Sequence, residues 1–191
     1  FNKIIKPTNK LKILLDPIKI TKKWPDEFFY ESNNFGYENQ NELIFKSKKL
    51  SGHRVNDKIL FDGENIILGD NKGNITVYSV NEKKTIFKYN FYKKKFKKIK
   101  KKLSLAIENN IIYTADNLGY LYSIDYRKKK LLWAKDLKIP FRSNLKLVKN
   151  KIIVADQNNT FYVFNKFNGS QLKFVPTEET IIKNDFINSI V

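Results

Sequence analysis

The chain has 191 residues and a formal net charge of +18 at pH 7, because 37 Lys and Arg residues outnumber 19 Asp and Glu residues. It contains no cysteine, which excludes a disulfide framework, thiolate metal sites and cysteine catalysis from these residues. The 41% of hydrophobic residues, including 15 Phe and 10 Tyr, can build a core, but no apolar run is long enough to predict a membrane-spanning helix.

The excess of positive charge has two interpretations. A basic face that neutralises phosphates is typical of nucleic-acid binding. However, only three of the 37 basic residues are arginines, namely Arg54, Arg127 and Arg142, and specific phosphate and base recognition favours the planar guanidinium group. The chain is also rich in Asn and Ile, as an AT-rich genome would impose. We therefore favour enrichment of lysine at solvated positions, which argues against nucleic acid as a partner.

Residues 1–40 form a lead-in that lacks the pattern of the rest of the chain. Pro7, Pro17 and Pro25 interrupt it, and Trp24-Pro25 followed by an Asn-rich segment predicts extended, turn-rich structure. The next segment, Glu42–Lys48, predicts one strand. The chain has no methionine, from which we expect a piece of a longer protein that starts upstream.

Residues 41–191 contain one pattern three times. Each copy is an apolar run, a polar turn that opens with aspartate, and a second apolar run, and the aspartates Asp70, Asp116 and Asp156 are 46 and 40 residues apart. Such a period, with strand–turn–strand content, is typical of propeller blades. The repeats are expected at about 59–91, 103–137 and 145–174.

Each repeat resolves into four short strands. Gly73 and Gly119 supply the positive φ that a tight hairpin requires, and Asn159 takes that place in the third repeat. The strands are nearly continuous apolar runs, which indicates that both faces of each sheet are covered. The predicted fold is therefore all-β, a β-propeller with four-stranded antiparallel blades.

A lysine run, Lys93–Lys102, separates the first two repeats, with Phe96 and Ile99 interleaved. Such a segment could meet an anionic membrane surface or nucleic acid. The alternative, which we favour, is a solvated loop between blades.

The repeats resemble the pyrroloquinoline-quinone-type (PQQ-like) propeller repeat, in which an apolar strand is followed by D-x-x-G-x-L-x-A-L-D, a polar turn and L-L-W. The second repeat carries the pattern most completely, ending in Leu131-Leu132-Trp133. The resemblance implies a blade-docking aromatic at Trp133, replaced by Phe87 in the first repeat and by Phe174, one residue late, in the third.

Within this superfamily the arrangement is similar to the B component of the outer-membrane β-barrel assembly machinery. Members have seven or eight blades, so the chain corresponds to an N-terminal half: three blades and a fourth that begins at about 181–191. The resemblance implies a periplasmic, outer-membrane-associated protein whose lipidated N-terminus would lie upstream. It also implies that Ile182 and Lys183 dock on the periplasmic repeats of the barrel insertase. By pattern alone, Ile181 and Ile182 could equally begin the fourth blade.

Catalysis finds no support in the sequence. Asp70, Asp116 and Asp156 recur at equivalent turns, which favours a structural role over a catalytic one. His53 is the only histidine, without the spacing of a metal site, and no cofactor is predicted. The sequence therefore favours a non-catalytic scaffold for protein–protein interaction. A fragment of a quinoprotein dehydrogenase is the alternative, and a basic adaptor for nucleic acid or anionic lipid is a third possibility.

Overall fold

A computed structural model describes residues 19–20, 23–26, 35–36 and 45–176 of the chain. Twelve of the strands in these residues form three four-stranded antiparallel sheets, each in chain order. Two further strands of two residues, β1 (Lys19–Ile20) and β2 (Phe35–Gly36), pair in parallel.

The first sheet contains β3 (Val55–Phe61), β4 (Asn65–Asp70), β5 (Asn74–Ser79) and β6 (Lys84–Asn90). The second contains β7 (Leu103–Glu108), β8 (Ile111–Asp116), β9 (Tyr120–Asp125) and β10 (Lys130–Asp136). The third contains β11 (Lys146–Val148), β12 (Lys151–Ala155), β13 (Phe161–Asn165) and β14 (Gln171–Val175).

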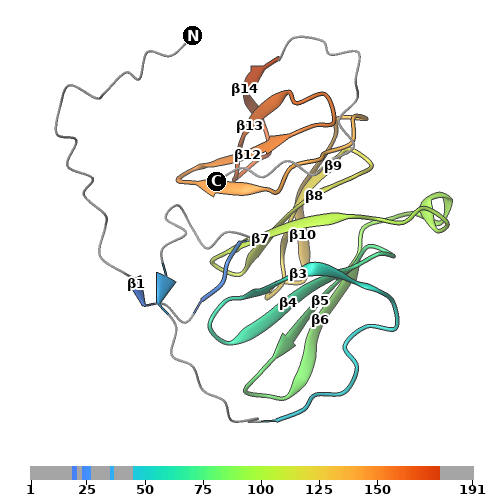
Figure 1. Ribbon diagram of the computed structural model, residues 1–191, viewed down its shortest axis with the longest axis vertical. Coiled ribbons are helices and arrows are strands. Elements are labelled where there is room, and N and C mark those ends of the chain that lie inside the picture. Colours follow the sequence, from blue (N-terminus) through green and yellow to red (C-terminus); the bar gives the residue numbers. More distant parts are fainter. Residues whose placement is uncertain (1–18, 21–22, 27–34, 37–44, 177–191) are drawn as a thin grey trace, which may run out of the picture.

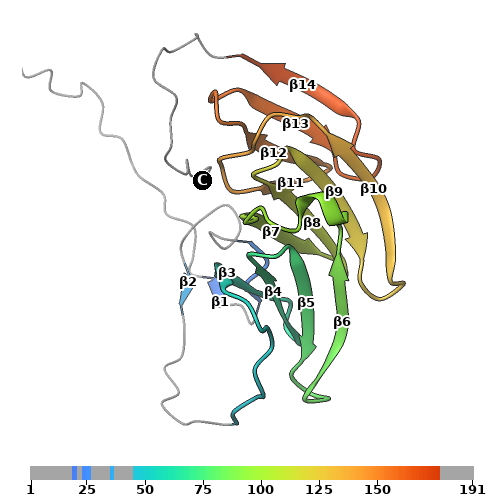
Figure 2. The same cartoon turned by 90° about the vertical axis from the view of Figure 1, so that its right-hand side faces the viewer.

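The three sheets lie one above another and fan out from a common side (Figures 1 and 2). In Figure 2 the first strand of each sheet, β3, β7 or β11, lies on the inner side, and β6, β10 and β14 lie on the outer side. The predicted all-β class and the incomplete propeller of four-stranded blades are thereby confirmed. The sheets are called blades 1, 2 and 3 below.

The strand predicted over Glu42–Lys48 is wrong for the part that the structure describes, because residues 45–48 form no strand. The first strand of blade 1 is β3 instead, which starts at Val55, before the expected beginning of the repeat. Its polar stretch, Asn56 to Lys58, and a bulge between Val55 and Ile59 conceal the alternation that marks a strand in sequence.

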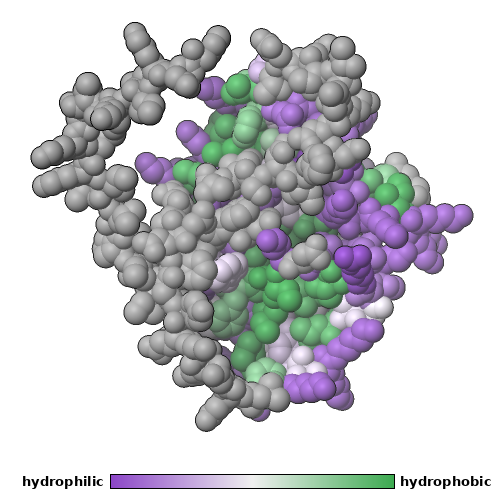
Figure 3. All heavy atoms as spheres, viewed as in Figure 1, coloured by the Kyte–Doolittle hydropathy of each residue, from purple (hydrophilic) through white to green (hydrophobic). Residues whose placement is uncertain are grey.

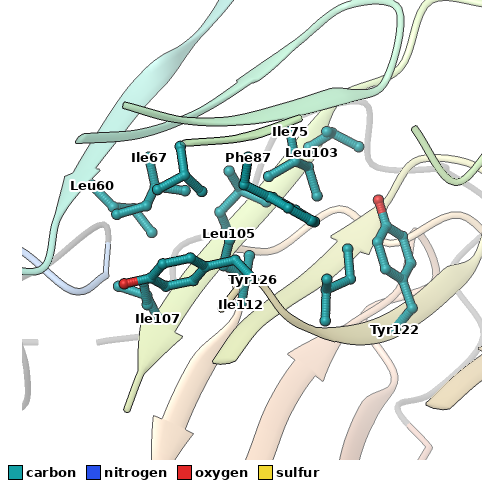
Figure 4. Packing of buried hydrophobic residues seen from close by; sticks show 12 residues of the cluster. Leu60, Ile67, Ile75, Phe87, Leu103, Leu105, Ile107, Ile112, Tyr122 and Tyr126 are labelled. Atoms are coloured by element: carbon teal, nitrogen blue, oxygen red, sulfur yellow. The ribbon is translucent and has the colours of Figure 1, made fainter. Parts of the chain in front are cut away.

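Apolar side chains fill the space between blades 1 and 2 (Figure 4). Blade 1 contributes Leu60, Ile67 and Phe87, and blade 2 faces them with Leu105 and Tyr122 among others. These side chains are at most 7% exposed. Burial of this kind, about 1.5 to 3 kcal/mol for each large apolar side chain, is what holds one blade to the next.

Blade 2 is buried on both faces. Its other face packs against blade 3 through a second cluster, to which it contributes small side chains such as Ala106 and Ala115 beside Tyr113 and Leu121. Consecutive residues Leu121 to Ile124 are therefore all buried, which explains the continuous apolar run in the sequence. In contrast, all five residues of β14 at the outer side of blade 3 are exposed.

The tripeptide Trp24–Asp26 connects the inner strands of all three blades. The backbone of Trp24 exchanges two hydrogen bonds with Phe61 of β3, and the Pro25 carbonyl accepts one from the Ile107 amide of β7 at 2.8 Å. The Asp26 carboxylate lies 3.7 Å from the Lys146 ammonium of β11, and both side chains are buried. A short piece of the lead-in thus adds an isolated β-bridge to β3, one backbone hydrogen bond to β7 and an ion pair to β11.

The contact between Trp133 and Gly169 gives a test of blade docking. Gly169 has φ +69°, and an added Cβ would lie 2.5 Å from the Trp133 ring, whose indole Nε1 donates to the Lys166 carbonyl at 3.1 Å. Gly169→Ala is expected to lower the free energy of unfolding by about 1 to 3 kcal/mol, through backbone strain and displacement of the indole. Urea denaturation followed by tryptophan fluorescence measures the change.

Gly52→Ala is the matched control for this substitution. Gly52 has no atom within 4 Å of an added Cβ and no positive φ. Its replacement should leave the urea midpoint unchanged within about 0.5 kcal/mol. Equal midpoint shifts in the two variants would contradict the proposed docking role of Gly169.

Candidate functional site

The three repeated aspartates form the same hairpin turn at one end of the blades. In each, carboxylate oxygen Oδ1 accepts hydrogen bonds from the backbone amides two and four residues later, at 2.7–3.0 Å. The aspartate carbonyl also accepts from the amide three residues later, that of Gly73, Gly119 or Asn159. These three residues have φ of 84°, 90° and 62°, so the positive φ that the turn requires is present in every copy.

The second carboxylate oxygen of each aspartate accepts from a hydroxyl group, and the donor differs between blades. Ser51 donates to Asp70 at 2.8 Å, Tyr92 donates to Asp116, and Tyr162 donates to Asp156 at 3.0 Å. Tyr92 follows β6 of blade 1, so its hydrogen bond joins blade 1 to the turn of blade 2. With both oxygens engaged, these carboxylates hold the turns and the blades in place.

The surroundings shift the pKa values of two equivalent aspartates in opposite directions. Burial alone would raise the pKa of Asp70, but hydrogen bonds from Asn74, Ser51 and Lys72 together outweigh it and lower this pKa. Burial dominates at Asp116 and raises its pKa, despite the hydrogen bonds from Tyr92 and the Tyr120 amide. The same turn therefore carries carboxyl groups with different acid strengths.

The same end of the blades carries the segments that link one blade to the next, residues 91–102 and 137–145. We call it the linker end. Backbone hydrogen bonds attach each segment to the turn of the preceding blade: Lys101 N donates to Asn71 O at 2.9 Å, and Phe141 N donates to Asp116 O at 3.0 Å. Figure 3 shows hydrophilic side chains gathered on this side of the molecule, at the right of the view.

The segment Lys93–Lys102 is only partly the solvated loop that the sequence predicts. It contains a 3₁₀ turn, η1 (Lys94–Phe96), and Lys101 is just 2% exposed. The Lys101 ammonium donates to the Phe96 carbonyl and lies 5.1 Å from the Tyr92 ring centroid. Sequence reasoning missed this residue, although the order buried–exposed–buried over residues 101–103 continues the alternation of β7 backwards and could have indicated it.

A hollow of about 470 Å³ lies at the linker end. The first strands of blades 1 and 2 and the chain preceding β11 form its walls, with Leu103, Ala115 and Phe141 as apolar parts. No Asp or Glu is among the described residues that line it. Six cationic side chains do so: Arg54, Lys58, Lys100, Lys101, Lys102 and Arg142. A concave wall of one charge sign concentrates a positive potential.

A second hollow, of about 690 Å³, lies at the opposite end of the strands and has mixed charge. The carboxylates of Asp26, Asp62, Glu64 and Glu108 line it together with Lys23 and Arg127. The Tyr126 hydroxyl donates to Asp62 at 2.8 Å and also lies 2.9 Å from Asn110 Oδ1. Burial raises the pKa of Tyr126 to about 12, so this hydroxyl keeps its proton and ties the two hairpins together.

The three predicted docking aromatics do not all lie on the same face of their blades. Phe87 is buried between blades 1 and 2, and Trp133 lies between blades 2 and 3. Phe174 pairs with Tyr162 across the sheet and meets its ring edge-on, so it shares the face turned toward blade 2. The position across from Val163, equivalent to Trp133, is Lys173. Phe174 therefore cannot dock blade 3 on a following blade.

Other predicted residues contribute little to the described site. His53 is exposed. Ile182, Lys183 and the expected beginning of a fourth blade at 181–191 lie outside the described residues. In the described part of the chain, no group of three or more His, Cys, Asp and Glu residues is placed to hold a metal ion, and no helix there is long and apolar enough to cross a membrane.

No protein-family model matches the chain, and no curated protein matches it. Solved structures do match. The chain is similar to the computationally designed protein Ika4, at 13% identity and a TM-score of 0.56, over 71% of this chain and 82% of that one. It is also similar to BamB from Moraxella catarrhalis, at 14% identity and a TM-score of 0.50, over 65% of this chain and 35% of that one.

A third similar structure is the quinohemoprotein alcohol dehydrogenase from Comamonas testosteroni, at 11% identity and a TM-score of 0.64, over 80% of this chain and 27% of that one. The chain thus spans about a third of BamB and about a quarter of the dehydrogenase. At these identities the similarity shows the β-propeller fold and does not determine the activity or the partners of the chain.

The opposite pKa shifts of Asp70 and Asp116 predict opposite pH dependence. A lowered pKa adds stability above the ordinary value of 3.8, which is lost as pH falls through the folded-state pKa. A raised pKa adds stability below 3.8, which is lost as pH rises through the folded-state pKa. Asp70→Asn should therefore cost about 1 to 3 kcal/mol at pH 7, because an amide NH₂ would face the donors Ser51 and Asn74, and less in acid.

Asp116→Asn is the matched variant, since its Oδ1 still accepts the two amides and Tyr92 can accept from the new NH₂ group. Its cost relative to the wild type should shrink as pH rises from 3 to 7. Urea denaturation of the three proteins across this range measures both trends. Parallel pH profiles for the two variants would rule out the opposite shifts.

Proposed function

We propose that the chain belongs to a non-catalytic β-propeller scaffold that binds other proteins, and that its role lies in the assembly of β-barrel proteins at the outer membrane. The observation that carries the proposal is that the repeated carboxylates have a structural role. In Asp70, Asp116 and Asp156, one carboxylate oxygen holds the turn and the other accepts from a hydroxyl group outside it, so the most distinctive residues of the chain build blades. Similarity to BamB in fold supports the choice among propeller functions.

A fragment of a quinoprotein dehydrogenase is the competing function, because such an enzyme shares the fold. It would need a calcium ion held by several oxygen ligands and a quinone site. Among the described residues, including the four carboxylates of the second hollow, no group of three or more His, Cys, Asp and Glu residues is placed to hold such an ion. The carboxylates at the linker end already accept hydrogen bonds, and six cationic side chains surround the hollow there, where a calcium ion would be repelled.

The outer side of blade 3 suits an interaction role. Within the described residues, the outer edge of β14 pairs with no other strand. Leu172, Phe174 and Val175 of this strand are 40–52% exposed, and Phe167 before it is 63% exposed. Open strand edges and clustered exposed apolar side chains are where proteins add strands or dock partners.

The partner proposed for the protein is the barrel insertase, through its periplasmic repeats, with Ile182 and Lys183 as contact residues on the basis of the family resemblance. A lysine at this position keeps the charge but lacks the bidentate geometry of the family's arginine. The corresponding location is the periplasmic side of the outer membrane.

Binding of the full chain to purified periplasmic repeats, measured by biolayer interferometry, tests this proposal. Ile182→Asp should weaken binding about 30-fold, as expected for a central apolar contact of about 2 kcal/mol, and Lys183→Arg should strengthen it. Ile99→Asp, at an exposed isoleucine of the linker end, is the control and should bind as the wild type does. Calcium-dependent binding of pyrroloquinoline quinone, with no binding to the repeats, would favour the dehydrogenase.

A further inference from the structure

The hollow at the linker end is built by three separate parts of the chain, each of which brings cations to it. Arg54 immediately precedes β3, Lys100–Lys102 immediately precede β7, and Arg142 lies shortly before β11. The linking segments of all three blades thus converge on one concavity. Like charges brought together in this way repel one another, so the arrangement costs stability unless a negative charge lies among them.

No carboxylate in the described part of the chain forms an ion pair with Arg54, Lys100, Lys102 or Arg142. Ion pairs do form elsewhere, for example between Arg127 and Glu64 at 3.2 Å and between Lys166 and Glu108. The carboxylates of Asp70 and Asp116, whose charges act on Lys101, are only 1% exposed and already accept several hydrogen bonds. The charges of these four cations are therefore not compensated by ion pairs with side chains that the structure describes.

The wall of the hollow also holds polar atoms that no described protein group satisfies. Of the six buried side-chain atoms without a hydrogen-bond partner in the described residues, two belong to lining residues, Arg142 Nε and Asn71 Oδ1. Only Arg142 Nε is a donor, so it is the one that an oxyanion could satisfy. Buried polar groups without partners are rare in folded proteins and call for an explanation at each site. A ligand oxygen that accepts a hydrogen bond from Arg142 Nε would fix the orientation of the guanidinium plane.

The choice of arginine at this hollow is informative in a chain that uses lysine almost everywhere. Only three of its 37 basic residues are arginines, and two of them line this hollow. Enrichment of lysine by base composition explains the exposed lysines but not these arginines. A guanidinium group binds carboxylate or phosphate through two parallel hydrogen bonds, which an ammonium group cannot do.

We propose that this hollow binds a small ligand that carries at least two oxyanion groups, carboxylates or phosphates, with Arg54 and Arg142 as bidentate contacts. Its volume of about 470 Å³ lies in the range of small-molecule sites. Lys101 forms part of the wall, where burial and the nearby Lys72 lower its pKa, and a bound anion would offset this cost. The proposal is independent of the scaffold function, which concerns other surfaces.

Isothermal titration calorimetry of the full chain at constant ionic strength tests the site, with citrate and pyrophosphate as probes and chloride as the reference anion. Saturable 1:1 binding is expected. Binding of citrate alone would identify carboxylates as the ligand chemistry, and binding of pyrophosphate alone would identify phosphates. Either outcome supports the site, whereas no saturable binding of either probe overturns it.

Substitutions distinguish this site from a diffuse positive field. Arg54→Gln and Arg142→Gln should each weaken binding at least 10-fold, whereas Arg54→Lys and Arg142→Lys, which keep the charge and give a second check if a Gln variant misfolds, should weaken it less. Arg127→Gln removes the third arginine, at the opposite end of the strands, and should bind as the wild type does. An equal loss in Arg127→Gln, or binding only to long polyanions, would refute the proposal.

Discussion

The packing of neighbouring sheets, face against face, is the interaction on which the rest of this structure depends. A four-stranded sheet exposes two faces, and its apolar residues are removed from water only when another sheet covers them. Blade 2 has a neighbour on each side, so residues such as Tyr113 and Tyr122 are buried on opposite faces of one sheet. The turns, the linking segments and the ionic ties all act on blades that this packing has already brought together.

Features that depend on a few neighbouring residues could be predicted from the sequence. An aspartate followed three residues later by glycine or asparagine encodes a hairpin by itself, and continuous apolar runs encode a sheet covered on both faces. The first strand of blade 1 was not predictable, because Asn56 and Lys58 interrupt its pattern at a bulge. The prediction for Phe174 failed for a different reason. The bulge in the outer strand pair is common to all three blades, but Phe174 lies one residue past the position equivalent to Phe87 and Trp133, and successive residues of a strand point to opposite faces.

The hollow at the linker end lies beyond local sequence reasoning for a different reason. Arg54 and Arg142 are 88 positions apart in the chain, and only the stacking of three blades brings both to one wall. In sequence each is one basic residue among many. In the structure, some cationic side chains are dispersed over the surface and others line the same hollow. Only the second group creates a chemical site. Composition accounts for the number of charges, and topology accounts for their grouping.

The tripeptide Trp24–Asp26 has a consequence for the order in which the chain folds. Its partners are Phe61, Ile107 and Lys146, so it closes progressively longer loops, and contacts between residues so distant in sequence slow folding. A ribosome makes this peptide before any of its partners. It must therefore wait until about 120 further residues have been made before all of its contacts can form. The earliest of these segments to be synthesised therefore completes its contacts only after β11, the first strand of blade 3, has been made.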